Sequence, residues 1–135
     1  MKVSVAMCTY NGEKYIEEQL NSILHQTKKI DEIIICDDGS KDKTLEICNE
    51  ILKSSNVEYT LKLNKKNLGF AKNFYQAITL CSGDIIFFCD QDDIWKENKI
   101  DLMCQVFNND PDTLLVFSNA YITNENLEVT DWGFQ

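Results

Sequence analysis

The stretch Ile85-Ile86-Phe87-Phe88-Cys89-Asp90-Gln91-Asp92-Asp93 places three carboxylates directly after a short apolar run. An apolar run with Gly83 before it and acids after it is typical of a buried strand that ends in a loop. Carboxylates this close together repel one another and raise each other's pKa unless a cation or several hydrogen-bond donors neutralise them. The simplest neutraliser is a divalent metal ion, so the stretch indicates a strand that delivers metal ligands to a loop.

Strand-like apolar runs alternate with helical spacing along most of the chain. Strands are predicted at residues 3–8, 32–36, 57–63, 85–89 and 114–117, and apolar residues recur at helical spacing over 16–24, 45–52, 70–81 and 100–107. The strict alternation over 57–63 favours a strand with one buried face near a sheet edge. Together these patterns predict an α/β fold with a mostly parallel sheet and helices on both faces. A length of 135 residues predicts one domain, residues 1–135.

Charge and cysteine content narrow the class of protein. The net charge of −9, from 13 basic and 22 acidic residues, argues against a nucleic-acid partner, because such proteins usually carry a basic stripe. The six cysteines form no C-x-x-C pair, which favours reduced, buried thiols and a reducing compartment. The first residues lack the apolar region of a secretory signal, and no stretch has the length of a membrane span. We therefore expect a cytoplasmic protein.

Polar clusters follow three of the predicted strands. Thr9-Tyr10-Asn11 follows the first, Asp37-Asp38-Gly39-Ser40 the second, and Asp90-Gln91-Asp92-Asp93 the fourth. Ligands of open α/β sheets bind at the carboxyl ends of the strands, so these clusters are expected to converge on one site. Each also has a structural interpretation: a packed rim tyrosine, a turn with Ser40 as N-cap of the next helix, or a solvated acidic loop.

Four segments carry a resemblance to a known family. In chain order they are Val3-Ser4-Val5 through Thr9-Tyr10-Asn11 with Tyr15-Ile16 and Ser22-Ile23; Asp37-Asp38-Gly39-Ser40 with Asp42 and Thr44; Asn67-Leu68-Gly69 with Asn73; and Gly83-Asp84 through Asp90-Gln91-Asp92-Asp93. The ordered set resembles the nucleotide-sugar-binding half of family 2 glycosyltransferases with the GT-A fold, a Rossmann-like arrangement. The wording Asp-Gln-Asp-Asp-Ile-Trp is similar to bacterial rhamnosyl- and galactosyltransferase-like members that build surface polysaccharides.

The resemblance implies roles for particular residues. Tyr10 would lie against the nucleotide base, and Asp38, with Asp37, would accept a hydrogen bond from the base edge. Asp92, with Asp90, would bind Mg²⁺ or Mn²⁺ at the diphosphate, and Asp90 would alternatively reach the ribose. Thr9, Asn11 and Lys72 complete the expected nucleotide-binding set.

The same resemblance implies partners beyond the site. The donor would be a UDP- or dTDP-linked sugar, and the acceptor a hydroxyl group on a glycan or a lipid-linked acceptor in surface polysaccharide or cell-envelope synthesis. The full-length protein would associate peripherally with the inner face of the membrane.

Two departures limit the match. The family commonly has arginine where Lys72 precedes Asn73, and lysine lacks the planar bidentate fork. The general base and acceptor pocket are expected beyond Gln135. Trp132 and Phe134 have no evident partners near the terminus, so the chain is predicted to be an incomplete donor-binding domain.

Three other functions fit parts of the pattern. Asp90-x-Asp92 after an apolar strand also resembles haloacid-dehalogenase-like phosphatases, in which the first Asp is the nucleophile, although there the motif follows the first strand. A non-catalytic module that binds a nucleotide or metal fits the missing base. A purely structural αβ domain would need the acids only for solubility.

Overall fold

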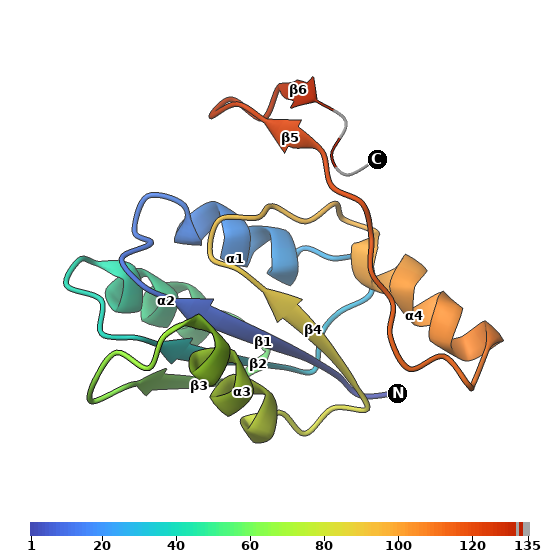
Figure 1. The fold of residues 1–135 in the computed structure, drawn as a ribbon, viewed down its shortest axis with the longest axis horizontal. Helices are drawn as coiled ribbons and strands as arrows, with labels where there is room; N and C mark the ends of the chain where they lie inside the picture. Colours follow the sequence, from blue (N-terminus) through green and yellow to red (C-terminus); the bar gives the residue numbers. More distant parts are fainter. Residues whose placement is uncertain (132, 134–135) are drawn as a thin grey trace. The chain divides into compact units, whose positions relative to one another are not determined.

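Four parallel strands form the central sheet of the protein. The computed structural model describes residues 1–131 and 133, so Trp132 and Phe134 lie outside the described residues. The strands are β1 (Val3–Thr9), β2 (Glu32–Asp37), β3 (Glu58–Leu63) and β4 (Ile85–Cys89), in the order β3-β2-β1-β4 (Figure 1). All three strand pairs are parallel. The predicted α/β class and parallel sheet are confirmed, as is the edge position of the strand in 57–63.

Helices cover both faces of this sheet. The covering helices are α1 (Ile16–Leu24), α2 (Thr44–Lys53) and α3 (Phe70–Leu80), and a fourth helix, α4 (Lys99–Asn109), follows β4 in the sequence. On one face, Ala6 and Ile34 form a buried cluster with Ala77 of α3. On the other face, Cys89 lies level with Met7 and receives a hydrogen bond from Gln19 of α1. Because alternate strand residues point to opposite faces, α1 and α3 lie on opposite sides.

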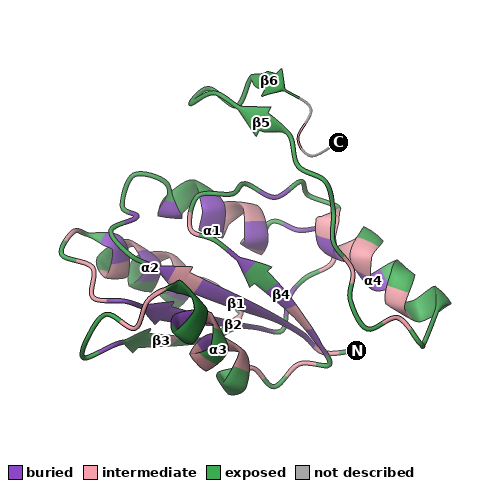
Figure 2. Ribbon diagram, in the orientation of Figure 1, coloured by how far each residue is buried: buried purple, intermediate pink, exposed green. Residues whose placement is uncertain are grey.

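Burial is deepest in the two central strands. Figure 2 shows β1 and β2 almost entirely buried, and Val5, Met7, Ile33 and Ile35 are fully inaccessible to solvent. In β4, by contrast, Phe87 is buried while Phe88 is 58% exposed. The fourth strand is therefore half-buried at a sheet edge rather than wholly buried.

The chain divides into two compact units, Met1–Asp101 and a second that begins at Leu102. In the second unit, β5 (Ile122–Thr123) and β6 (Val129–Asp131) form a short antiparallel pair. The strand predicted at 114–117 is wrong, since this segment has no regular structure and Leu114 is 93% exposed. An apolar run becomes a strand only when its backbone groups pair with a neighbour.

Two further findings concern the chain as a whole. All six cysteines are free thiols, with Cys36, Cys48, Cys89 and Cys104 buried. Among the described residues, no helix combines the length and apolar character needed to span a bilayer.

Candidate functional site

Asp37, the last residue of β2, holds the loop that follows it. Its Oδ1 accepts hydrogen bonds from the backbone N–H groups of Gly39 (3.0 Å) and Ser40 (2.7 Å). Its Oδ2 accepts from Thr9 Oγ1 (2.7 Å) and Ser40 Oγ (2.6 Å). This buried carboxylate therefore joins the ends of β1 and β2. The prediction that Ser40 is the N-cap of α2 is wrong, because the helix begins only at Thr44.

Asp38 fixes a second loop, the one that leads into α3. Its Oδ1 accepts from the backbone N–H of Leu68 (2.7 Å) and from Asn64 Nδ2 (3.0 Å), and its Oδ2 accepts from the N–H of Gly69 (2.9 Å). Burial acts to raise the pKa of Asp38, but the hydrogen bonds from Leu68, Asn64 and Gly69 outweigh it and lower the pKa below its ordinary value. The carboxylate is thus kept charged inside the fold.

The acids after β4 lie in a different environment. Asp90, Asp92 and Asp93 are all exposed. Desolvation, followed by repulsion from Asp93 and Asp92, raises the pKa of Asp90 above its ordinary value. The crowding expected from the sequence is therefore present, and a bound cation would relieve it.

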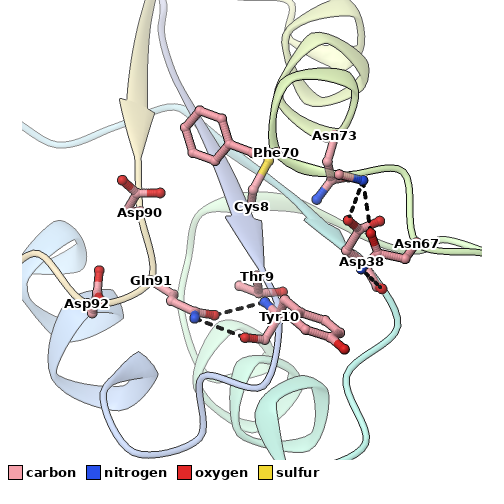
Figure 3. A pocket seen from close by; sticks show the side chains of 11 residues that line it. Cys8, Thr9, Tyr10, Asp38, Asn67, Phe70, Asn73, Asp90, Gln91 and Asp92 are labelled. Carbon is pink, nitrogen blue, oxygen red and sulfur yellow. Dashed lines mark hydrogen bonds between the residues drawn. The ribbon is translucent and has the colours of Figure 1, made fainter.

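One cavity of about 450 Å³ brings these elements together (Figure 3). It is lined by Cys8, Thr9, Tyr10, Asp38, Asn67, Gly69, Phe70, Asn73, Asp90, Gln91 and Asp92. The expected convergence of three strand ends is confirmed for Thr9, Tyr10, Asp38, Asp90 and Asp92. The Tyr10 side chain is half exposed, which leaves its ring accessible to a ligand.

Three residues expected at the nucleotide do not line this cavity: Asn11, Asp37 and Lys72. Asn11 adopts a positive φ of 47°, and its Oδ1 accepts from the N–H of Lys41 (2.8 Å). Its own N–H donates to Ser40 Oγ (2.8 Å), so it ties two loops together. Lys72 is exposed on α3.

Several residues of the cavity were not predicted as contacts. Buried Asn73 donates from Nδ2 to the carbonyl oxygen of Cys36 (2.8 Å), and its Oδ1 accepts from Asn64 Nδ2 (2.8 Å). Asn67 donates to the carbonyl oxygen of Asp38 (3.3 Å). Asn67 and Asn73 belong to the motifs that carried the resemblance, but spacing alone does not show which backbone groups such amides reach.

Cys8 also lines the cavity, and its chemistry there is restricted. Burial, together with the nearby Cys36, Asp90 and Asp38, raises the pKa of its thiol to about 12. The thiol is therefore protonated at neutral pH, and Cys8 does not offer a thiolate nucleophile.

Trp95 packs behind the acidic loop. Its side chain is buried, its ring lies 5.8 Å from that of Phe87, and Lys99 Nζ lies 4.7 Å from the ring centroid. These contacts make Trp95 a packing residue behind the loop.

The carboxylates fit a metal that shares its coordination with a substrate. No group of three or more His, Cys, Asp or Glu side chains arranged to hold a metal occurs among residues 1–131 and 133. Mg²⁺, however, is usually bound through one or two carboxylates plus substrate phosphates and water. Asp90 and Asp92 on one cavity wall supply such a donor set.

Comparison with solved structures places the fold. The Staphylococcus aureus protein TarS, residues 1–349 in complex with UDP, superposes with a TM-score of 0.73 at 29% identity, over 81% of this chain and 32% of that one. The mannosyltransferase PcManGT from Pyrobaculum calidifontis, in complex with GDP-Man and Mn²⁺, gives a TM-score of 0.65 at 28% identity, over 70% and 28% of the two chains. The fold is that of GT-A glycosyltransferases.

Sequence comparison gives the family. The dTDP-rhamnosyl transferase RfbG of Shigella flexneri is 47% identical over 125 residues, which cover 87% of this chain and 40% of that protein. The Escherichia coli glucosyltransferase WfgD is 33% identical over 126 residues, covering 92% and 47%. The chain thus spans less than half the length of these relatives. A sequence profile of glycosyl transferase family 2 matches residues 4–131, and the chain belongs to that family.

Proposed function

We propose that this chain is the donor-binding part of a glycosyltransferase. The enzyme would transfer a sugar from a UDP- or dTDP-linked donor to a hydroxyl group of a glycan or lipid-linked acceptor, in surface polysaccharide or cell-envelope synthesis. The observation that carries the proposal is the single cavity in which Tyr10, Asp38, Asp90 and Asp92 meet. Related proteins support a nucleotide donor, since solved structures of TarS hold UDP and UDP-GlcNAc.

The base would be recognised on the Tyr10 and Asp38 side of the cavity. The half-exposed Tyr10 ring offers a face for stacking, a contact typically worth about 1–3 kcal/mol per base in nucleic-acid systems. Asp38 already accepts hydrogen bonds from Leu68, Asn64 and Gly69. A carboxylate accepts about four, so Asp38 retains capacity for a donor on the base edge.

The diphosphate would be bound on the opposite side. Asp92 and Asp90 would hold Mg²⁺ or Mn²⁺, as hard carboxylate oxygens suit these ions. When bound, the cation would neutralise the charge of the departing nucleoside diphosphate. The Mn²⁺ in solved structures of two similar proteins supports a divalent cation as the cofactor.

The remaining predicted residues act around the cavity. Thr9, Asn11 and Asp37 position the loops that carry Tyr10 and Asp38, through the hydrogen bonds described above. Lys72 would meet a phosphate as a flexible point charge. The general base and the acceptor pocket would be supplied by another part of the enzyme, so the chain alone would bind nucleotide with little or no turnover. Peripheral attachment of the full-length protein to the inner face of the membrane is part of the same proposal.

Calorimetric titration with UDP and with dTDP, with and without Mn²⁺, tests the donor site. We expect Mn²⁺-dependent binding of one of the two nucleotides, and at least about tenfold weaker binding in Asp92→Ala, since a metal–diphosphate contact would be lost. Asp112→Ala, an exposed aspartate that does not line the cavity, is the matched control and should bind like the parent. Binding without any metal dependence, or undiminished binding in Asp92→Ala, would refute the site assignment.

Tyr10→Ala tests the base side independently. It should weaken nucleotide binding, whereas Tyr75→Ala, a more exposed tyrosine on α3, should not. Equal affinities of Tyr10→Ala and the parent would remove the stacking role.

A further inference from the structure

The Gln91 side chain connects the acidic loop to Tyr10. The Tyr10 N–H donates to Gln91 Oε1 (2.9 Å), and Gln91 Nε2 donates to the Tyr10 carbonyl oxygen (3.0 Å), as the dashed lines in Figure 3 show. One side-chain amide thus satisfies both backbone groups of a single residue, as an opposite residue does in a hydrogen-bonded antiparallel pair. The two residues are 81 positions apart in sequence.

This connection begins where the sheet stops. The parallel pairing of β1 and β4 ends at Met7 and Cys89. Beyond that point the segments that follow β1 and β4 lead to opposite sides of the cavity, with Tyr10 on one side and Asp90 and Asp92 on the other (Figure 3). The Gln91 amide therefore continues the link between the two strands into the loops that form the site.

Gly12 leaves room for this amide. A Cβ atom at residue 12 would lie 2.2 Å from Gln91 Oε1 and 2.5 Å from its Cδ, far inside van der Waals contact. The Gly12 N–H is itself held by Thr44 Oγ1 (2.8 Å), so this backbone is not free to move aside. The absence of a side chain at residue 12 is thus matched to the amide of residue 91.

We infer that Gln91 is a positioning residue that couples the carboxylates at the diphosphate to the aromatic ring at the base. The inference rests on the proposed function, because Gln91 would set the distance between the groups that bind the two ends of the donor. Gln91 contacts the Tyr10 backbone rather than its ring, so it acts on the donor through Tyr10. Coupling between two binding regions is reciprocal, so base stacking and metal–diphosphate binding support each other.

The chemistry of position 91 is specific. A glutamate would keep an acceptor for the Tyr10 N–H, but it would lose the donor to the Tyr10 carbonyl and add a fourth negative charge beside Asp90, Asp92 and Asp93. Methionine fills a similar volume without hydrogen bonds. Gln91→Met therefore removes the two hydrogen bonds while keeping most of the packing.

A double-mutant cycle on the full chain tests the coupling. UDP and dTDP affinities in the presence of Mn²⁺ are measured by calorimetry for the parent, Gln91→Met, Tyr10→Ala and the double variant, with Gln105→Ala on α4 as control. We expect Gln91→Met to weaken binding by about tenfold in the parent, which corresponds to about 1.4 kcal/mol. In the Tyr10→Ala background the loss should fall to about twofold or less, because the ring that Gln91 positions is absent.

Thermal unfolding shows whether each variant is folded, and a second variant tests the same contact from the Gly12 side. Gly12→Ala would displace the Gln91 amide from the other side and should give the same dependence on Tyr10. Equal affinity of Gln91→Met and the parent would overturn the inference, as would an equal loss in both backgrounds. A parent that binds neither nucleotide would overturn the proposed function and this inference together, whereas a binding parent with an unaffected Gln91→Met would overturn the inference alone.

Discussion

Asp37-Asp38 at the end of β2 and the segment from Asp90 to Asp93 after β4 both lie at the carboxyl ends of parallel strands, yet their carboxylates have opposite environments. Asp37 and Asp38 are buried, and backbone N–H groups of the following loops donate to them. The acids after β4 are exposed and repel one another. The pKa of Asp38 is lowered and that of Asp90 is raised. An aspartate can therefore either fix the loops of a site or remain available to a cation, depending on whether the fold supplies hydrogen-bond donors to its carboxylate.

The largest effect is expected at Asp37. Asp37→Ala would leave the Thr9 hydroxyl and the N–H groups of Gly39 and Ser40 without their acceptor in a buried region. Because each unsatisfied buried donor costs roughly 1–3 kcal/mol, we expect the free energy of unfolding to fall by about 3 kcal/mol or more. Urea denaturation measures this, with Asp112→Ala as a control that should stay within about 0.5 kcal/mol of the parent. A stable Asp37→Ala would mean that its hydrogen bonds do not hold the loop.

A smaller effect, dependent on pH, is expected at Asp38. Asp38→Asn would set an amide donor against the N–H of Leu68 or Gly69 and should cost about 2 kcal/mol at pH 7. Because the folded pKa of Asp38 lies below the unfolded one, its contribution is complete above the unfolded pKa, about 3.9, and is lost as pH falls through the folded pKa. The parent and Asp38→Asn should therefore converge in stability as pH falls below about 4. A constant difference between pH 7 and pH 3 would contradict this.

The smallest effect, with the opposite sign, is expected at Asp90. Its folded pKa lies above the unfolded one, so the charged form disfavours folding once the pH exceeds both values. Asp90→Asn should then be equal to or slightly more stable than the parent at pH 7, by at most about 0.5 kcal/mol. The difference should vanish below about pH 4. Chemical denaturation across this range checks the sign, and a clear loss of stability at pH 7 would show that Asp90 has a structural partner.

The sequence predicted those features that depend on local pattern. The parallel sheet followed from apolar runs that alternate with helical spacing, and the shared rim of Tyr10, Asp38 and Asp92 followed from the rule that strand ends meet at one edge. The strand prediction for residues 114–117 failed because apolar character does not supply a pairing partner. Phe117 of this segment is 88% exposed.

Which of the acids accept hydrogen bonds from the loops, and which face the cavity, could not be predicted in the same way. Asp37 and Asp38 are adjacent, but whether a carboxylate faces the loop donors or the cavity depends on backbone geometry that spacing does not encode. The same holds for Gln91, whose partner Tyr10 is 81 positions away. Residues that hold distant loops together are recognisable only once the loops are placed.

Electron paramagnetic resonance of Mn²⁺ in the presence of UDP or dTDP tests the central claim most directly, because it counts bound metal without requiring turnover. We predict one nucleotide-dependent Mn²⁺ site in the parent, retained in Asp112→Ala and lost when Asp90 and Asp92 are both replaced by alanine. An Asp90/Asp92 double variant that is folded and still binds Mn²⁺ as the parent does would contradict the assignment of the exposed acids to the metal.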